Sequence, residues 1–153
     1  MLNHYKYITI PLITLVLCQI IKFGIESIKS KKLKWGRLFN GSGGMPSSHT
    51  SFSTSITMLM GLNFGFDSPF FALPLVFTLI VAYDAMGLRM QSGKQAEAIN
   101  LIVDELFSNE IKVNFGKLKE ELGHKPLEVV GGIMLGIITV SYTHLRAHET
   151  SQD

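Results

Sequence analysis

Charged residues and cysteines are both scarce in this sequence. Only 17% of the 153 residues are charged, against about 25% in an ordinary soluble domain. The mean hydropathy is +0.28, and 46% of the residues are hydrophobic. This composition argues against an ordinary soluble domain, because such a domain needs more charged residues to cover its surface. The single cysteine, Cys18, excludes an internal disulfide and is interpreted as a small core residue.

The apolar residues are concentrated in blocks. Residues 7–23 read YITIPLITLVLCQIIKF, residues 51–66 read SFSTSITMLMGLNFGF, and residues 68–88 read SPFFALPLVFTLIVAYDAMGL. The first and third blocks are long enough, or nearly so, to cross a hydrocarbon core of about 30 Å as helices. The second block is shorter and rich in Ser, Thr and Gly, which suits a helix packed among others. The sequence therefore predicts an integral membrane protein.

The first block lacks the features of a cleaved secretory signal. Little positive charge precedes it, no small-x-small cleavage site follows it, and it runs into a lysine-rich stretch. These features favour a retained membrane anchor over a removed signal peptide.

Two polar segments, 24–50 and 89–126, separate the apolar blocks. The first segment has a lone acid, Glu26, and these basic residues: Lys29, Lys31, Lys32, Lys34 and Arg37. The positive-inside rule places it in the cytoplasm and the amino terminus outside. A short connection around Asp67 makes the next two blocks a hairpin, so the segment 89–126 returns to the same side. Every candidate site residue is therefore expected at the cytoplasmic membrane face.

Residues 95–107, QAEAINLIVDELF, place Ala98, Ile102 and Leu106 at helical spacing. This pattern predicts an amphipathic helix that lies on the membrane or on neighbouring helices. The sequence leaves two roles open for this helix, a solvated connector or a functional lid.

A last apolar block, residues 126–140, spans only fifteen residues, or roughly 22 Å as a helix, and stops short of crossing. The following residues, SYTHLRAHETSQD, resemble translated adapter sequence. We therefore expect a single domain over 1–140, a non-native tail over 141–153, and a fourth transmembrane helix that is truncated here. His144 and His148 have the i, i+4 spacing of a metal pair, but in this context we expect no metal site.

The stretch GGMPSSHTS, residues 43–51, lies at the start of the second apolar block. One interpretation is a turn followed by a helix that Ser47 or Ser48 caps. The other is a phosphate pocket at a helix start, in which His49 transfers a proton.

A second histidine, His124, lies four residues before Glu128 at another expected helix start. A carboxylate that accepts a hydrogen bond from one imidazole nitrogen makes the other nitrogen a better nucleophile. In the alternative, Glu128 favours the helix dipole and His124 faces water. Asp84 lies near the end of an apolar helix, where it either pairs with Arg89 or Lys94 or serves catalysis or cation binding.

Three stretches carry a resemblance to a known family: MPSSHTS, YDAMGLRMQSGKQAEAIN and LGHKPLEVVGGIMLG. The chain resembles the divergent branch of the type 2 phosphatidic acid phosphatase superfamily, the acid phosphatase and vanadium-haloperoxidase-related membrane proteins. The resemblance runs from about residue 5 to residue 140. It implies an all-α, polytopic membrane helical bundle of about four transmembrane helices, the last truncated, plus an amphipathic cytoplasmic helix.

The resemblance also implies roles for individual residues. Pro46, Ser47 and His49 match a Pro-Ser-Gly-His motif with Ser48 in place of glycine, and this first histidine protonates the leaving oxygen. His124 matches the second histidine, which attacks phosphorus, and Glu128 stands in place of its aspartate partner. The phosphate-binding candidates are Arg89, Ser47, Ser48, Arg37 and Lys34, with Asp84 and Lys94 in support.

These observations predict a membrane phosphatase for a lipid phosphate or related phosphomonoester, without metal or other cofactor. Its expected partners are membrane lipids and a phosphorylated amphiphilic substrate, with no nucleic acid; a homo-oligomer is left open. One alternative is a non-catalytic membrane protein that binds anionic head groups or a protein partner. Vanadate-dependent halide oxidation is a weaker alternative, because that chemistry belongs to much larger, soluble relatives.

Overall fold

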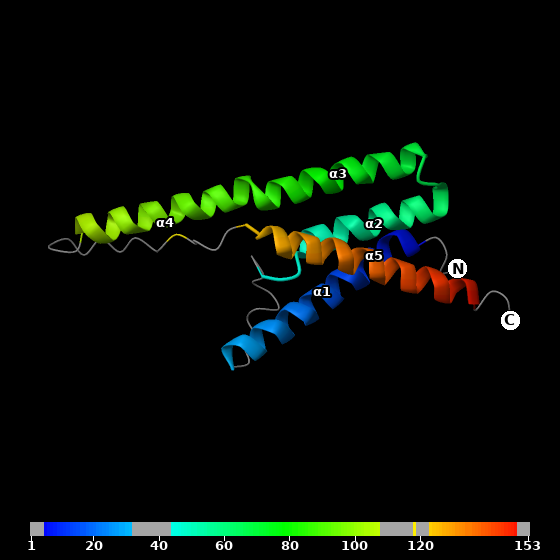
Figure 1. Ribbon diagram of the computed structural model, residues 1–153, viewed down its shortest axis with the longest axis horizontal. Coiled ribbons are helices and arrows are strands. Elements are labelled where there is room, and N and C mark those ends of the chain that lie inside the picture. The colour runs from blue at the N-terminus through cyan, green and yellow to red at the C-terminus, as the bar shows by residue number, and fades with distance from the viewer. Residues whose placement is uncertain (1–4, 32–43, 108–117, 119–122, 150–153) are drawn as a thin grey trace.

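The computed structural model of the protein describes residues 5–31, 44–107, 118 and 123–149. The described residues form helices and their connections, without strands (Figure 1). The helices are α1 (Lys6–Ser30), α2 (Ser48–Phe64), α3 (Pro69–Met86), α4 (Leu88–Phe107) and α5 (Pro126–Glu149). The predicted all-α membrane bundle is confirmed.

Helices α2 and α5 form the central pair of the bundle, with α1 and α3 packed on either side (Figure 1). Glycines on α5 allow the two central backbones to approach closely. A Cβ atom on Gly132 would lie 2.6 Å from the carbonyl oxygen of Ser47, and one on Gly136 would lie 2.8 Å from that of Ser51. Small residues four positions apart are a common interface between membrane helices, because dispersion contacts between close backbones replace the hydrophobic effect.

The hydroxyl-rich face of α2 is buried inside the bundle. Several of these hydroxyls donate to carbonyl oxygens of their own helix, as Thr57 does to Ser53 at 3.0 Å. The Thr57 hydroxyl also lies 2.9 Å from that of Thr78 on α3. The prediction that this block is a helix packed among others is therefore correct.

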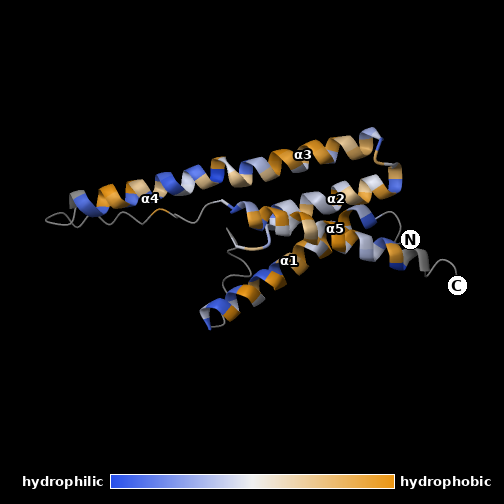
Figure 2. Ribbon diagram, in the orientation of Figure 1, coloured by the Kyte–Doolittle hydropathy of each residue, from blue (hydrophilic) through white to orange (hydrophobic). Residues whose placement is uncertain are grey.

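Hydrophobic residues predominate along α3 and are frequent along α1 (Figure 2), and many of their apolar side chains are exposed. By length and composition, helices over Lys6–Ser30, Pro69–Glu105 and Pro126–Arg146 can cross a membrane. The chain is therefore a multi-pass membrane protein, with exposed side chains such as Leu73 and Phe77 suited to contact lipid.

Helix α4 begins at Leu88, seven residues before the predicted start at residue 95. After a break at Gly87 it continues roughly along the direction of α3 and extends beyond the bundle (Figure 1). Its apolar residues Ile99 and Ile102 are exposed. This part of the apolar stripe is thus not buried against another described helix, while Gly93 and Ala96 form part of the buried side.

Helix α5 is longer than predicted. It continues past residue 140 to Glu149, and its span Pro126–Arg146 is long enough to cross. The expectation that the last apolar block stops short is therefore wrong for this chain, because residues 137–149 contain neither Gly nor Pro to end the helix. His144 lies within this helix. The domain boundary at residue 140 stays a prediction.

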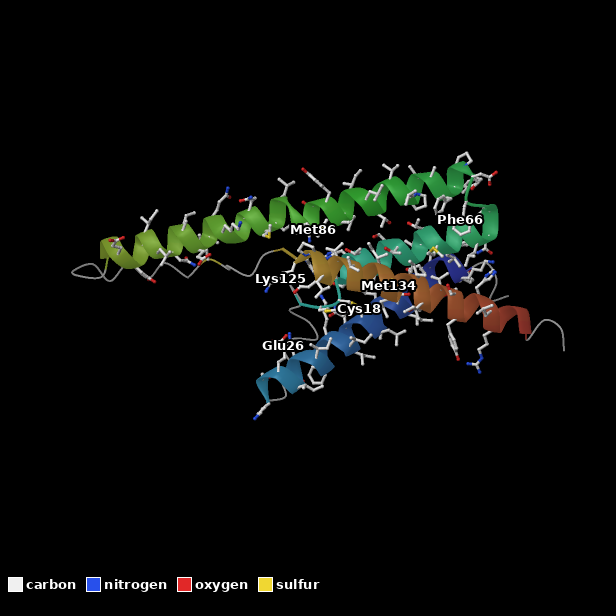
Figure 3. All side chains as sticks on the ribbon, in the orientation of Figure 1. Cys18, Glu26, Phe66, Met86, Lys125 and Met134 are labelled. Atoms are coloured by element: carbon white, nitrogen blue, oxygen red, sulfur yellow. The ribbon has the colours of Figure 1, made fainter. Side chains whose placement is uncertain are left out.

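The two ends of the bundle differ in character. At one end, the hairpin between α2 and α3 lies beside the start of α1, where the rings of Tyr7 and Phe64 stack with centroids 5.8 Å apart. Figure 3 shows Phe66 at this end, whereas Lys125 lies at the other. That other end brings together the start of α2, the end of α3 and the start of α5.

Labelling of introduced cysteines tests the predicted orientation. In a Cys18→Ser background, Lys31→Cys and Glu105→Cys should react only with a reagent that reaches the cytoplasmic side. Asp67→Cys, on the α2–α3 connection, should react with a reagent applied from outside. The positive-inside rule places the lysine-rich segment in the cytoplasm, and this connection lies at the other end of the bundle. Labelling of positions 31 and 105 from opposite sides would contradict a single-face site.

The glycine contact between α2 and α5 makes a second prediction. Gly132→Ala should lower stability by about 1–3 kcal/mol, because the new methyl group overlaps the backbone of α2. Thermal unfolding in detergent would measure this loss. Gly24→Ala is the matched control, since a Cβ atom at Gly24 has no neighbour within 4 Å among the described residues. Equal stability of the two variants would show that the close approach is not needed.

Candidate functional site

Ser47 caps α2 and ties it to α5. Its side-chain oxygen accepts hydrogen bonds from the backbone N–H of Thr50 at 3.4 Å and from the Thr50 hydroxyl at 2.9 Å. Its own N–H donates to the carbonyl oxygen of Glu128 at 2.8 Å. The capping interpretation is therefore confirmed for Ser47. Ser48 is buried beside it, while His49 is exposed at the end of the bundle.

Gly123 and His124 are held against the junction of α3 and α4. Gly123 has φ +101°, and a Cβ atom there would lie 2.5 Å from the backbone nitrogen of Met90. Only glycine fits this conformation and this close approach without strain. The N–H of His124 donates to the carbonyl oxygen of Ala85 at 2.9 Å. These contacts fix the backbone of His124 before α5 begins.

The ring of His124 is buried, with the residue only 4% exposed. Neither ring nitrogen has a hydrogen-bond partner within the described part of the chain. The predicted bond to Glu128 is not formed, because that carboxylate accepts from the backbone N–H of Lys125 at 3.2 Å and stabilises the first turn of α5. The alternative in which His124 faces water is also wrong. A buried imidazole with two free nitrogens has unused capacity to bind a ligand.

Burial lowers the pKa of His124 from the ordinary value of 6.5 to about 4, and the nearby positive charges of Lys22, His49 and Arg89 act in the same direction. The imidazole is therefore neutral at pH 7. A neutral imidazole has a free lone pair, which is the form needed for nucleophilic attack.

Lys22 belongs to the candidate site although no sequence motif predicts it there. It lies on α1, is only 6% exposed, and its Nζ donates to the hydroxyl of Ser48 at 3.3 Å. The available signal was a lone lysine inside an apolar run, because a buried charge in a membrane helix is costly and usually functional. The predicted phosphate-binding cations Lys34 and Arg37 lie outside the described residues.

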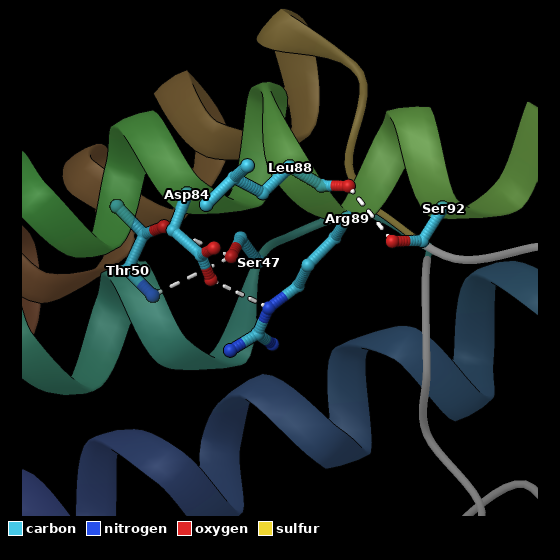
Figure 4. A network of polar contacts seen from close by, with 6 residues as sticks. All are labelled: Ser47, Thr50, Asp84, Leu88, Arg89 and Ser92. Atoms are coloured by element: carbon cyan, nitrogen blue, oxygen red, sulfur yellow. Dashed lines mark hydrogen bonds and ion pairs between the residues drawn. The ribbon is translucent and has the colours of Figure 1, made fainter.

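Asp84 and Arg89 form an ion pair at the end of α3 and the start of α4. The Nε atom of Arg89 donates to Asp84 Oδ2 at 2.7 Å (Figure 4). The pairing interpretation of Asp84 is confirmed with Arg89, whereas Lys94 is exposed on α4. The two terminal guanidinium nitrogens of Arg89 point away from Asp84 in Figure 4. Arg89 lies within electrostatic range of both His49 and His124.

The described site thus combines two histidines, two cations and a helix start at one end of the bundle. Of the residues selected from the sequence, the structure brings together His49, Ser47, Ser48, Arg89, Asp84 and His124. The side chain of Glu128 takes part only through the turn that begins α5. Within the described residues, no group of three or more His, Cys, Asp or Glu side chains is arranged to hold a metal ion.

A family model described as the divergent PAP2 family matches residues 3–139. The chain belongs to this family. The predicted resemblance is confirmed over nearly the same range, and all three site stretches of this divergent PAP2 protein lie inside it. The membrane protein YuiD of Bacillus subtilis (strain 168) is 39% identical over 137 residues, covering 83% of this chain and 86% of that protein. No solved structure matches.

A histidine titration tests the electrostatics of the site. Carbon NMR of labelled histidine should show His124 neutral down to about pH 4, with the signal assigned by its loss in His124→Gln. Lys22→Met should raise this pKa, because one nearby positive charge is removed, yet leave it below 6.5, because burial remains. A wild-type midpoint near 6.5 would mean that water reaches the ring.

Proposed function

We propose that this divergent PAP2 protein is a membrane phosphatase in which His124 is the nucleophile. Its substrate is a phosphate monoester of a lipid or a related amphiphile, hydrolysed at the cytoplasmic face. The observation that carries the proposal is the buried, neutral His124. Its two ring nitrogens have no hydrogen-bond partner among the described residues, and Lys22 and Arg89 lie within electrostatic range.

The reaction has two steps that use both histidines. In the first, a ring nitrogen of His124 attacks phosphorus, the bond from phosphorus to the ester oxygen breaks, and protonated His49 gives its proton to the leaving alkoxide. In the second, water attacks phosphorus, His49 takes a proton from that water, and the bond from phosphorus to nitrogen breaks. Inorganic phosphate leaves, His124 is neutral again, and His49 again carries its proton.

Positive charge and fixed donors supply the rest of the catalysis. Phosphoryl transfer depends mainly on positioning and on stabilising the charge on the equatorial oxygens. Lys22 provides a point charge beside Ser48, and Arg89 can offer its two terminal nitrogens because its Nε is occupied by Asp84. Orientation of Arg89 is thus the role we assign to Asp84.

Other predicted residues have supporting parts in this proposal. Lys34 and Arg37 stay proposed phosphate ligands from the basic segment, and Lys94 stays a proposed supporting cation on α4. Glu128 acts indirectly: its carboxylate caps the turn after His124, and its carbonyl oxygen accepts from Ser47.

The location of the site favours an amphiphilic substrate. The residues lie where apolar helices end, and the segment that follows α1 is rich in lysine. A phosphate attached to a hydrocarbon chain would keep its tail in lipid and be drawn to this positive charge.

One observation favours the non-catalytic alternative, in which the same pocket binds anionic head groups. Nucleophilic histidines usually receive an orienting hydrogen bond, and His124 has none from the described residues. If binding is the function, the buried Lys22 and the exposed Arg89 are sufficient for recognition of a phosphate group.

Purified protein assayed against a panel of phosphorylated lipids separates the two functions. His124→Ala should abolish turnover with substrate affinity largely kept, and acid-labile phosphohistidine should be trapped in wild type. His49→Ala should slow the first step by on the order of a hundred- to ten-thousand-fold. Arg89→Ala should weaken both binding and rate. Glu128→Gln should have a smaller effect than His124→Ala, because the attacking atom stays in place.

His144→Ala is the matched control for loss of a histidine, since it lies outside the matched residues 3–139. Full hydrolysis by His124→Ala, or no turnover of any phosphate ester by wild type, would favour the binding function.

A further inference from the structure

Asn100 joins α4 to the chain that leads toward the site. Asn100 is buried, with an exposed fraction of 7%. Its side-chain Nδ2 donates to the carbonyl oxygen of Leu118 at 2.9 Å, and its Oδ1 accepts from the N–H of Leu118 at 3.0 Å. One side-chain amide therefore satisfies both backbone groups of Leu118, as a neighbouring backbone would in a sheet.

A second attachment lies five residues further along the chain. There Gly123 packs against the backbone of Met90, and the N–H of His124 donates to Ala85. The two points of attachment on α4, Asn100 and Met90, are ten residues apart, or about 15 Å along the helix. Five residues reach at most about 17 Å. The attachment at Asn100 therefore restricts where Gly123 can lie.

We propose that Asn100 is a positioning residue for His124. By holding Leu118 on α4, it limits the movement of the chain before His124 and keeps the imidazole in its buried position near Lys22 and Arg89. Asn100 lies about 18 Å along α4 from Leu88, so it does not contact the substrate. The proposal rests on the proposed function in one respect, namely that His124 is the reacting group.

The chemistry of the amide explains why asparagine suits this position. Asparagine offers one donor and one acceptor at the spacing of the two Leu118 groups. Aspartate would keep the acceptor, lose the donor and place a negative charge beside a carbonyl oxygen. Alanine would keep the helix and lose both hydrogen bonds, leaving the backbone groups of Leu118 without this partner.

The test uses full-length protein in detergent and two variants that release the same attachment from opposite sides. Asn100→Ala removes the side-chain amide, and Leu118→Pro removes the backbone N–H without changing α4. Leu118→Ala keeps that N–H, and Gln95→Ala changes an exposed position of α4, so these two are the matched controls. Size-exclusion profiles show whether each variant is folded.

Acylation of histidines by diethyl pyrocarbonate, mapped by mass spectrometry, reads the position of His124 without any need for turnover. In wild type, the buried His124 should react slowly and the exposed His49 quickly. Asn100→Ala and Leu118→Pro should each raise the His124 rate about tenfold or more, because local opening becomes easier, and leave the His49 rate within about twofold. Asn100→Asp should have an intermediate effect, and both controls should match wild type.

Kinetics with a phosphorylated lipid complete the test. Asn100→Ala should lower kcat while KM changes little, because Lys22 and Arg89 still hold the phosphate. Unchanged His124 reactivity in folded Asn100→Ala, Asn100→Asp and Leu118→Pro would overturn the proposal, even if wild type is an active phosphatase. If Asn100→Ala and Leu118→Pro raise the reactivity of His124 but wild type hydrolyses no phosphate ester, the positioning role of Asn100 is supported. The same result would count against the proposed phosphatase function.

Discussion

The close approach of α2 and α5 is the contact on which the site depends. Because Gly132 has no side chain, the carbonyl oxygen of Ser47 packs closely against the backbone of α5. The N–H of Ser47 donates to the carbonyl oxygen of Glu128. The start of one helix is thereby fixed against the start of the other. Because His49 follows Ser47 and His124 precedes α5, this one helix contact brings together two histidines that are 75 residues apart in the sequence.

The candidate site contains buried polar side chains that are costly to fold. Lys22 is buried in a membrane helix, and both nitrogens of His124 lack partners among the described residues. An imidazole that is buried without a hydrogen-bond partner reduces stability. Such groups persist where function requires them, and other parts of the fold offset their cost. Asp84 forms an ion pair with Arg89, and the Nζ of Lys22 donates to the hydroxyl of Ser48.

Helix α4 links the bundle to the chain before His124. It continues past the end of α3, and its exposed residues Ile99 and Ile102 contribute little to the core. Two of its residues contact the chain before His124. The backbone of Met90 packs against Gly123, and the side chain of Asn100 bonds to Leu118. A helix that lies mainly outside the bundle therefore takes part in placing a residue inside it.

The sequence alone determined the membrane class, the main helices and most residues of the candidate site. Runs of apolar residues and the lysine-rich segment are local properties, and hydrocarbon thickness and positive charge act on them without reference to tertiary contacts. The motif residues His49, Arg89 and His124 were likewise visible. Only the tertiary structure showed that Lys22 belongs to the site, that Glu128 bonds to Lys125 in place of His124, and that Asn100 holds Leu118. Those outcomes depend on which faces of separate helices meet, and the side chains involved have several partners within reach until packing selects one.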